Sequence, residues 1–286
     1  MPTRREALGF LAGGSLANAI AQSKTDAIFG MAQGVAVAVD CKSGQLLASH
    51  RMDTARMLVA PPGSAIKPLS LLALLQSGKL RANETHPCSG DLRIAGRSFA
   101  CSHPRMSAPV SLPEAIAYSC NEYVARVATR FAPGELAVAL ARFGLASRTQ
   151  LSGTQPEATG RIDHAESVEA NQLQALGEDR VSVTVLELAM AYHFLTANAA
   201  RPETAPILEG LEGAVEFGTA QYAQVAGIKV AGKTGSAAGR WAWFAGFAPS
   251  RQPRVVVAIL VQGRAGGSDA APIGGKFLAA QLERKL

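Results

Sequence analysis

The sequence has few charged residues, few aromatic residues and few cysteines. Charged side chains make up 17% of the 286 residues and aromatic ones 6%, whereas 48% are hydrophobic. This composition is typical of a globular protein with a sizeable core and excludes a disordered chain. Lysine and arginine exceed the acidic residues and give a net charge of +6. Because they are scattered and no nucleic-acid-binding motif accompanies them, they indicate a solvated surface with some attraction to an anionic polymer, and we expect no nucleic-acid partner.

The four cysteines lack the spacing of a zinc site. No CxxC or HxxxH pattern accompanies them, so we expect no metal and no cofactor. Cys88 and Cys101 flank a polar segment with the alternation and glycine turn of a small hairpin, and in an exported protein such a pair can form a disulfide. Cys41 and Cys120 lie in apolar surroundings, which favours buried free thiols.

The first 21 residues have the features of an export signal. Arg4 and Arg5 precede an apolar stretch, residues 7–21, that ends in the small-x-small pattern Ala-Ile-Ala. Paired arginines before a mildly apolar stretch are typical of a twin-arginine signal, although an amphipathic N-terminus is the alternative. The stretch is too short and too rich in glycine for a transmembrane helix. We therefore predict an extracytoplasmic location, in the periplasm or cell envelope, and a single catalytic domain over residues 22–286.

Hydrophobic periodicity predicts a sheet whose strands are interrupted by helices. Residues 34–40 and 45–50 alternate and are joined by a Lys-Ser-Gly turn, which predicts a hairpin. The order of the elements predicts an α/β (α+β) sandwich, with a five-stranded antiparallel sheet flanked by N- and C-terminal helices and an all-helical lobe inserted between strands 2 and 3. The later strands are expected at 228–235, 241–247 and 254–262, and the helices at 64–76, 113–131, 134–143, 183–198 and 272–286.

Ser64 and Lys67 form an S-x-x-K tetrad at the start of a predicted helix. Residues three apart lie on the same helix face, so the lysine amine can reach the serine oxygen. A serine hydroxyl is a weak nucleophile at neutral pH and needs a base, and a lysine can serve when burial or a neighbouring cation keeps its amine neutral. Alone the tetrad is a weak signal, because S-x-x-K recurs by chance on helix surfaces.

Two further triplets make the tetrad specific. Ser119-Cys120-Asn121 follows a helical segment, and Lys233-Thr234-Gly235 lies on a predicted strand. In the order S-x-x-K, S-x-N, K-T-G they are the signature set of penicillin-interacting serine enzymes. The segments PPGSAIKP, YSCNEY, VSVTVLELAMAY and AGKTGSA with the following WFAGFAP resemble the transpeptidase domain of penicillin-binding proteins, over residue 34 to the C-terminus.

This resemblance implies a serine D,D-transpeptidase or carboxypeptidase that acts on the D-alanyl-D-alanine stem peptides of peptidoglycan and binds penicillin covalently. Ser64 would attack the substrate carbonyl and form an acyl-enzyme, and Lys67 would take the serine proton. Ser119 and Asn121 would pass a proton to the leaving amine and hold the substrate amide. The stem peptide and β-lactam antibiotics are therefore the expected ligands.

The third motif and its neighbour imply substrate binding. Lys233 and Thr234 would bind the substrate carboxylate, a role that suits a cation beside a hydroxyl. Gly235 would let the substrate backbone lie against the strand. The backbone N–H groups of Ser64 and Ser236 would form the oxyanion hole. Since no pedestal or glycosyltransferase domain is recognisable, we expect that a cell-wall assembly protein can act as a partner.

A serine β-lactamase and a non-catalytic β-lactam or wall-peptide sensor are the alternatives. A β-lactamase needs a second base for deacylation, and Glu166 and Glu169 lie in the right stretch. Their surroundings, HAESVEANQLQ, favour a solvated acidic face instead. Class D enzymes favour valine at the position of Asn121, and a sensor usually loses a motif residue, whereas none is lost here. The family's G-Q-G is replaced by Gly-Glu-Asp-Arg at 177–180, so the resemblance does not predict the structure of that loop.

Overall fold

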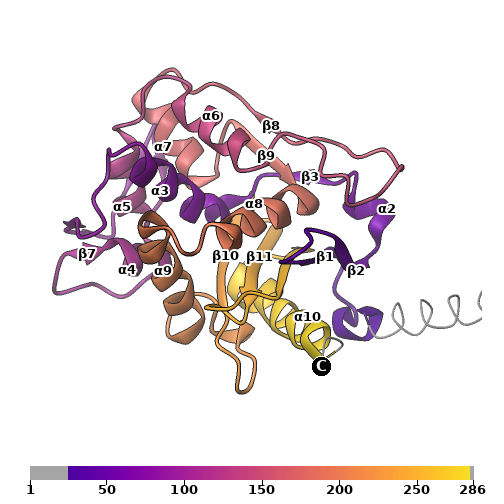
Figure 1. Cartoon of the computed structure of the whole chain (residues 1–286). Coiled ribbons are helices and arrows are strands. Elements are labelled where there is room, and N and C mark those ends of the chain that lie inside the picture. Colours follow the sequence, from indigo (N-terminus) through magenta and orange to yellow (C-terminus); the bar gives the residue numbers. More distant parts are fainter. Residues whose placement is uncertain (1–24, 284–286) are drawn as a thin grey trace, which may run out of the picture.

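The computed structural model describes residues 25–283, and the predicted export signal lies outside them. Within this part of the chain no helix is both long and apolar enough to cross a lipid bilayer. Figure 1 shows a twisted sheet with helices on both of its faces and a larger group of helices beside it.

The central sheet has five antiparallel strands in the order β10-β11-β12-β1-β2, so the predicted five-stranded antiparallel sheet is confirmed. In the register of its centre, Val37 of β1 pairs with Ala258 of β12 on one side and with Ser49 of β2 on the other. Strand β10, which carries the K-T-G motif, forms one edge of the sheet. The strands are β1 (Gly34–Asp40), β2 (Leu46–His50), β10 (Ala231–Ala237), β11 (Trp241–Ala248) and β12 (Val255–Gln262).

The three central strands β1, β11 and β12 are buried on both faces of the sheet, which explains why they are almost wholly apolar. Successive side chains of a strand point to opposite faces. In β1, Val35 and Val37 belong to a core shared with helix α8 (Val185–Ala197), whereas Ala36 and Ala38 belong to a second core shared with helix α10 (Ala271–Glu283). The two helices therefore cover opposite faces of the sheet (Figure 1).

The segment between β2 and β10 contains most of the helices but is not all-helical, so that finer expectation is not confirmed. Small sheets β3-β9-β8, β4-β7 and β5-β6 accompany the helices. The helices are α2 (Met52–Ala55), η1 (Gly63–Ile66), α3 (Lys67–Gln76), α4 (Leu112–Ala117), α5 (Asn121–Ala128), α6 (Glu135–Arg142), α7 (Val168–Leu176), α8, η2 (Pro202–Thr204), α9 (Ala205–Glu216) and η3 (Gln221–Ala223), and the π-helical turn η4 (Gly266–Ala270) precedes α10. The short strands are β3 (Val59–Ala60), β4 (Thr85–His86), β5 (Arg93–Ile94), β6 (Arg97–Ser98), β7 (Val110–Ser111), β8 (Arg161–Ile162) and β9 (Val181–Thr184).

Two predicted helices differ from the structure because side chains cap the backbone. The helix expected over 113–131 is split into α4 and α5, since Ser119 adopts a left-handed backbone conformation, φ 58°, and the Cys120 sulfur accepts a hydrogen bond from the first turn of α5. The helix expected from 183 begins at 185. There Thr184 and Glu187 form a capping box, and residues 181–184 pair as strand β9.

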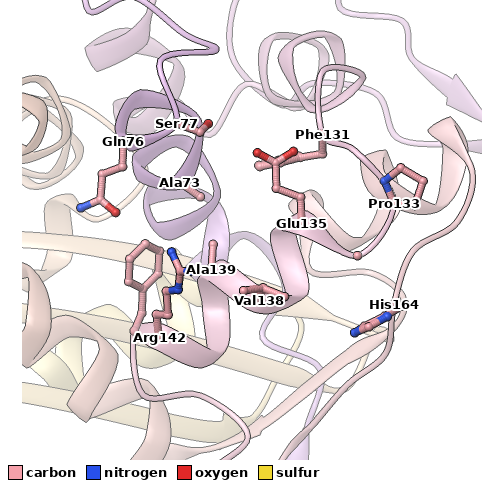
Figure 2. Close-up of a pocket in the computed structure, with 12 residues that line it drawn as sticks. Ala73, Gln76, Ser77, Phe131, Pro133, Glu135, Val138, Ala139, Arg142 and His164 are labelled. Carbon is pink, nitrogen blue, oxygen red and sulfur yellow. The ribbon is translucent and has the colours of Figure 1, made fainter.

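A cavity of about 350 Å³ lies between α3 and α6 (Figure 2). Glu135 and Arg142 of α6 line it together with His164. None of the residues of the three sequence motifs lines this cavity. It is therefore separate from the candidate active site.

Candidate active site

The segment that carries Ser64 lies directly against the edge strand β10. A Cβ atom on Gly63 would lie 2.3 Å from the Ser236 carbonyl oxygen, and one on Gly235 would lie 2.4 Å from the Pro62 carbonyl oxygen. Gly63 also has a positive φ of 51°. Only glycine fits such close backbone contact and such a conformation without strain. The two glycines thus let the nucleophile segment and the K-T-G strand meet backbone to backbone.

Three hydrogen bonds from other elements hold this segment in place. The indole Nε1 of Trp243 donates to the Pro61 carbonyl at 2.8 Å, and the Tyr192 hydroxyl donates to the Ala65 carbonyl at 2.8 Å. The Gly63 N–H donates to the Gly177 carbonyl at 3.1 Å. Strand β11, helix α8 and the loop after α7 therefore all fix the turn that presents Ser64, whose side chain is partly exposed.

Lys67 begins α3, about one helical turn after Ser64, and is completely buried. Its Nζ donates to the Ser119 carbonyl at 2.8 Å, to the Ser119 hydroxyl at 3.1 Å and to the Asn121 Oδ1. These bonds use all three donors of an ammonium group. The structure therefore brings together the lysine of the first motif and both polar residues of the second.

The left-handed backbone of Ser119 makes this arrangement possible. A residue other than glycine in this region carries a cost of roughly 1–3 kcal/mol. The turn ends α4 and points both the carbonyl and the hydroxyl of Ser119 at Lys67. Asn121, the first residue of α5, completes the set and donates through Nδ2 to the Phe99 carbonyl at 2.9 Å.

Lys233 and Thr234 lie on β10 and are both buried. The Lys233 Nζ donates to the Thr234 carbonyl at 3.0 Å, and the Thr234 hydroxyl donates to the Thr219 hydroxyl at 2.9 Å. Ser236 is exposed, and its hydroxyl accepts a hydrogen bond from the Gly266 N–H at 3.0 Å. The Ser236 backbone nitrogen lies next to the segment that carries Ser64, because a Cβ on Gly63 would lie 3.1 Å from it.

The two buried lysines have lowered pKa values. Burial lowers the pKa of Lys67 to about 8, against smaller opposing contributions from Cys120, Cys101 and Glu178. Burial, and then repulsion by the Lys67 charge, lowers the pKa of Lys233 well below its usual range. Loss of hydration disfavours an ammonium group, so both amines are easier to deprotonate than a surface lysine. Lys67 can therefore act as a base near neutral pH.

Glu178 is a candidate site residue that the sequence reasoning noticed only as a departure from G-Q-G. Its side chain is 25% exposed, pairs with Arg97 at 3.5 Å and interacts electrostatically with Lys67. Burial raises the pKa of Glu178. Glu166 and Glu169 are both exposed. Of these three glutamates, Glu178 is the one that interacts electrostatically with Lys67.

Cys88 and Cys101 lie beside each other, as the hairpin prediction requires, and β5 pairs with β6 between them. Their sulfur atoms are 3.7 Å apart and both thiols are free. The other two cysteines are also free, with Cys120 buried and Cys41 half-buried.

The chain is similar to proteins of one family. Residues 34–279 match the family model of the penicillin binding protein transpeptidase domain. Among curated proteins it is 27% identical to a peptidoglycan D,D-transpeptidase PbpA of Mycolicibacterium smegmatis over 273 residues, with 78% of this chain and 55% of that protein covered. It is 26% identical to a PbpA of Mycobacterium tuberculosis, with the same two shares covered. The chain thus spans about half the length of these relatives.

Solved structures share the fold. A structure described as a peptidoglycan glycosyltransferase from Burkholderia ambifaria superposes with a TM-score of 0.81 at 22% identity, with 95% of each chain covered. The transpeptidase domain of penicillin-binding protein 3 from Burkholderia pseudomallei gives a TM-score of 0.78 at 22% identity, with 93% of this chain and 91% of that chain covered. Penicillin-binding protein 3 of Mycobacterium tuberculosis, solved with aztreonam, gives 0.78 at 20% identity, with 93% and 76% covered.

Proposed function

The chain belongs to the penicillin-binding protein transpeptidase domain family, and from this premise we propose that it is a serine acyl-transferase acting on the D-alanyl-D-alanine stem peptides of peptidoglycan. The observation that carries the proposal is the buried Lys67 amine. It follows Ser64 by about one helical turn and is hydrogen-bonded to Ser119 and Asn121. The names of the curated relatives, peptidoglycan D,D-transpeptidases, support the same activity.

In the acylation step, the Ser64 Oγ attacks the carbonyl carbon of the penultimate D-alanine while the Lys67 amine accepts the hydroxyl proton. The backbone N–H groups of Ser64 and Ser236 stabilise the developing oxyanion. The peptide C–N bond then breaks, and the proton passes through Ser119 to the leaving D-alanine amine. An acceptor amine completes transpeptidation, whereas water completes carboxypeptidation.

Substrate binding is assigned to the K-T-G strand. Lys233 would supply positive charge beside β10 in its protonated form. The Thr234 hydroxyl, which is bonded to the Thr219 hydroxyl in the structure, would turn to donate to the substrate carboxylate. A peptide could lie along β10, because an edge strand offers unpaired backbone groups. Asn121 holds the substrate amide.

A β-lactam carries the same carboxylate beside a strained amide, so we propose that it acylates Ser64 too. Ring opening leaves the amine attached to the acyl group, so the whole drug stays on the enzyme. The proposed substrate is a wall polymer, so the export signal predicted over residues 1–21 fits an extracytoplasmic site of action. A cell-wall assembly protein is the proposed partner.

The test is the mass of the intact protein after incubation with benzylpenicillin, followed over time. We expect the wild type to gain the mass of one penicillin and Ser64→Ala to gain none. Ser107→Ala, which changes an exposed serine, is the matched control and should behave as the wild type. No adduct on the wild type would contradict the proposal and favour a binding-only protein.

The lifetime of the adduct separates the remaining alternatives. A long-lived adduct supports a penicillin-binding enzyme, whereas rapid loss with hydrolysed penicillin would indicate a serine β-lactamase. In that case Glu178, which interacts electrostatically with Lys67, is the first residue to test as deacylation base. Release of D-alanine from a stem pentapeptide, with and without an added acceptor amine, distinguishes transpeptidase from carboxypeptidase.

A further inference from the structure

Four metal-binding side chains converge next to the candidate active site. They are Cys88, Cys101, His103 and Cys120, and their donor atoms all lie within 4.8 Å of one another. Cys88 and Cys101 flank the β5–β6 hairpin, His103 follows in the same loop, and Cys120 stands at the N-terminus of α5. The sequence separations follow no zinc pattern, because the set is completed only where the hairpin folds onto the helix.

Four of the six distances between the donor atoms have the dimensions of a tetrahedral zinc site, and the other two, from His103 to the Cys101 and Cys120 sulfurs, are at most 4.8 Å. The three sulfur–sulfur separations are 3.7, 3.7 and 3.5 Å, and the Cys88 sulfur lies 3.6 Å from the His103 Nε2. Tetrahedral coordination with Zn–S bonds of about 2.3 Å and a Zn–N bond of about 2.05 Å places sulfurs about 3.8 Å apart and sulfur and nitrogen about 3.6 Å apart. A disulfide would need about 2.05 Å between one sulfur pair. Three nearly equal separations suit a shared metal ion better than any one disulfide.

The histidine presents the correct nitrogen. Its Nδ1 lies 2.8 Å from the Pro104 carbonyl oxygen. Because a carbonyl oxygen only accepts, Nδ1 carries the hydrogen, and Nε2 therefore offers a lone pair towards the sulfurs. Metal-binding histidines are commonly oriented by such a backbone contact. A surface pocket of about 330 Å³ lined by Cys88 and His103 provides a path for the ion.

We propose that Cys88, Cys101, Cys120 and His103 bind one zinc(II) ion. On binding, the three thiols release three protons to solvent, and three thiolates with one Zn²⁺ leave the site with a net charge of −1. Three cysteines and one histidine are a common ligand set for structural zinc, with all four positions filled by protein. This proposal departs from the sequence-based expectation that the protein binds no metal.

The zinc site would position the second motif. Cys120 lies between Ser119 and Asn121, the two residues bonded to Lys67. The loop that leads into Cys101 also contacts the motif, since the Asn121 Nδ2 donates to the Phe99 and Ala100 carbonyls at 2.9 and 3.3 Å. One ion would therefore fix both the turn that bears Ser119 and the loop that holds Asn121. This positioning role rests on the proposed function, but the metal site does not.

The test is the zinc content of the full chain, purified under reducing conditions, and its absorption when cobalt(II) replaces zinc in chelator-treated protein. We expect one zinc per chain, and the intense sulfur-to-cobalt and visible bands of a tetrahedral thiolate site. Cys101→Ser and His103→Ala should lose stoichiometric zinc and change these bands. Cys41→Ser is the matched control, because Cys41 lies outside the cluster, and it should retain both.

Two results would overturn the metal site. One is zinc content in the wild type no higher than in Cys101→Ser and His103→Ala, with circular dichroism showing that all three are folded. The other is a disulfide within the cluster in the purified wild type, together with no cobalt bands after reduction.

The benzylpenicillin acylation rate tests the positioning role separately. We expect chelation to slow acylation and zinc to restore it. If the protein holds stoichiometric zinc and chelation leaves the acylation rate unchanged, only the positioning role is overturned. Stoichiometric zinc in a protein that is never acylated would count against the proposed function and leave the metal site standing.

Discussion

Lys67 and Lys233 place two ammonium groups in the interior of the protein, both without solvent exposure. A buried lysine is uncommon because the charged form loses its hydration. Lys67 recovers part of this loss through its bonds to Ser119 and Asn121, and Lys233 through its bond to the Thr234 carbonyl. The remaining loss of hydration disfavours the charged form of each lysine and so lowers its pKa. A lysine that acts as a base needs a lowered pKa.

The acylation rate should rise with pH and level off above about pH 8. Only the neutral Lys67 amine can accept the Ser64 proton, and its pKa is about 8, so deprotonation as the pH rises increases the active fraction. The check is the rate of labelling by a fluorescent penicillin between pH 6 and pH 10. A rate that keeps rising to pH 10 would mean that Lys67 has an ordinary pKa.

Substitution of the same residue provides the control for this profile. Lys67→Met should slow labelling by about 10²- to 10⁴-fold, the usual range for loss of a general base. Lys42→Met, which changes an exposed lysine, should keep both the rate and the pH profile. An equal loss in both variants would show that the effect is not specific to Lys67.

At the scale of elements, the contact between η1 and β10 positions the site. Backbone meets backbone there, with Gly63 on one side and Gly235 on the other, and side chains from β11 and α8 hold the turn from behind. Neither element could shift without moving Ser64 relative to Ser236. Rigid support of this kind is what a preorganised oxyanion hole needs.

Gly63→Ala should impair both stability and acylation. The new Cβ would meet the Ser236 carbonyl at 2.3 Å, and alanine is strained at a φ of 51°. We expect a loss of about 2–4 kcal/mol in the free energy of unfolding, the range of severe point mutations, and at least about tenfold slower acylation. Urea denaturation and penicillin labelling provide the two measurements.

Gly227→Ala separates backbone strain from the clash. Gly227 has a similar φ of 71°, but a Cβ there would meet nothing within 4 Å. It should lose only about 1 kcal/mol and keep its acylation rate. If the two variants were equally destabilised and equally active, the close contact of η1 with β10 would have no role.

At the scale of the whole molecule, the sheet separates two cores with different tasks. The core under α8 adjoins the active site through Ile66 and Trp243, whereas the core under α10 lies on the opposite face. We therefore expect damage to the second core to lower stability more than it changes the acylation rate, because Ala65 and Ile66, between Ser64 and Lys67, belong to the first core.

Phe277→Ala tests this separation. Phe277 is completely buried in the core under α10, and removing a buried aromatic side chain costs roughly 3–5 kcal/mol. We expect that loss in urea denaturation, together with a penicillin-labelling rate close to that of the wild type at low temperature.

Phe217→Ala is the matched control, since Phe217 is 47% exposed and should lose less than half as much stability. A labelling rate that falls in Phe277→Ala while the protein is still folded would show that the second core also shapes the site.

The sequence by itself determined the central sheet and the order of the motifs. Its strands were predictable because apolar runs and turns are local signals, and β1, β11 and β12 match the expected ranges closely. The sequence does not show the break at Ser119, because the helical periodicity continues across it. The left-handed backbone of Ser119 ends α4, where the N–H groups of Ser119 and Cys120 donate to the Ile116 and Ala115 carbonyls, and it turns the Ser119 carbonyl to Lys67. The catalytic roles of the motif residues stay predictions.

Only the tertiary structure decided how residues from distant segments meet. Three features depend on how loops fold onto the helices. They are the burial of Lys67, the ion pair of Glu178 with Arg97, and the convergence of His103 with three cysteines. A loop has no periodic sequence pattern that indicates which segment it contacts. Its conformation depends on where its two ends lie and on side chains far away in the sequence. Spacing rules could therefore predict a nucleophile and a base at Ser64 and Lys67, but not the cluster of one histidine and three cysteines near them.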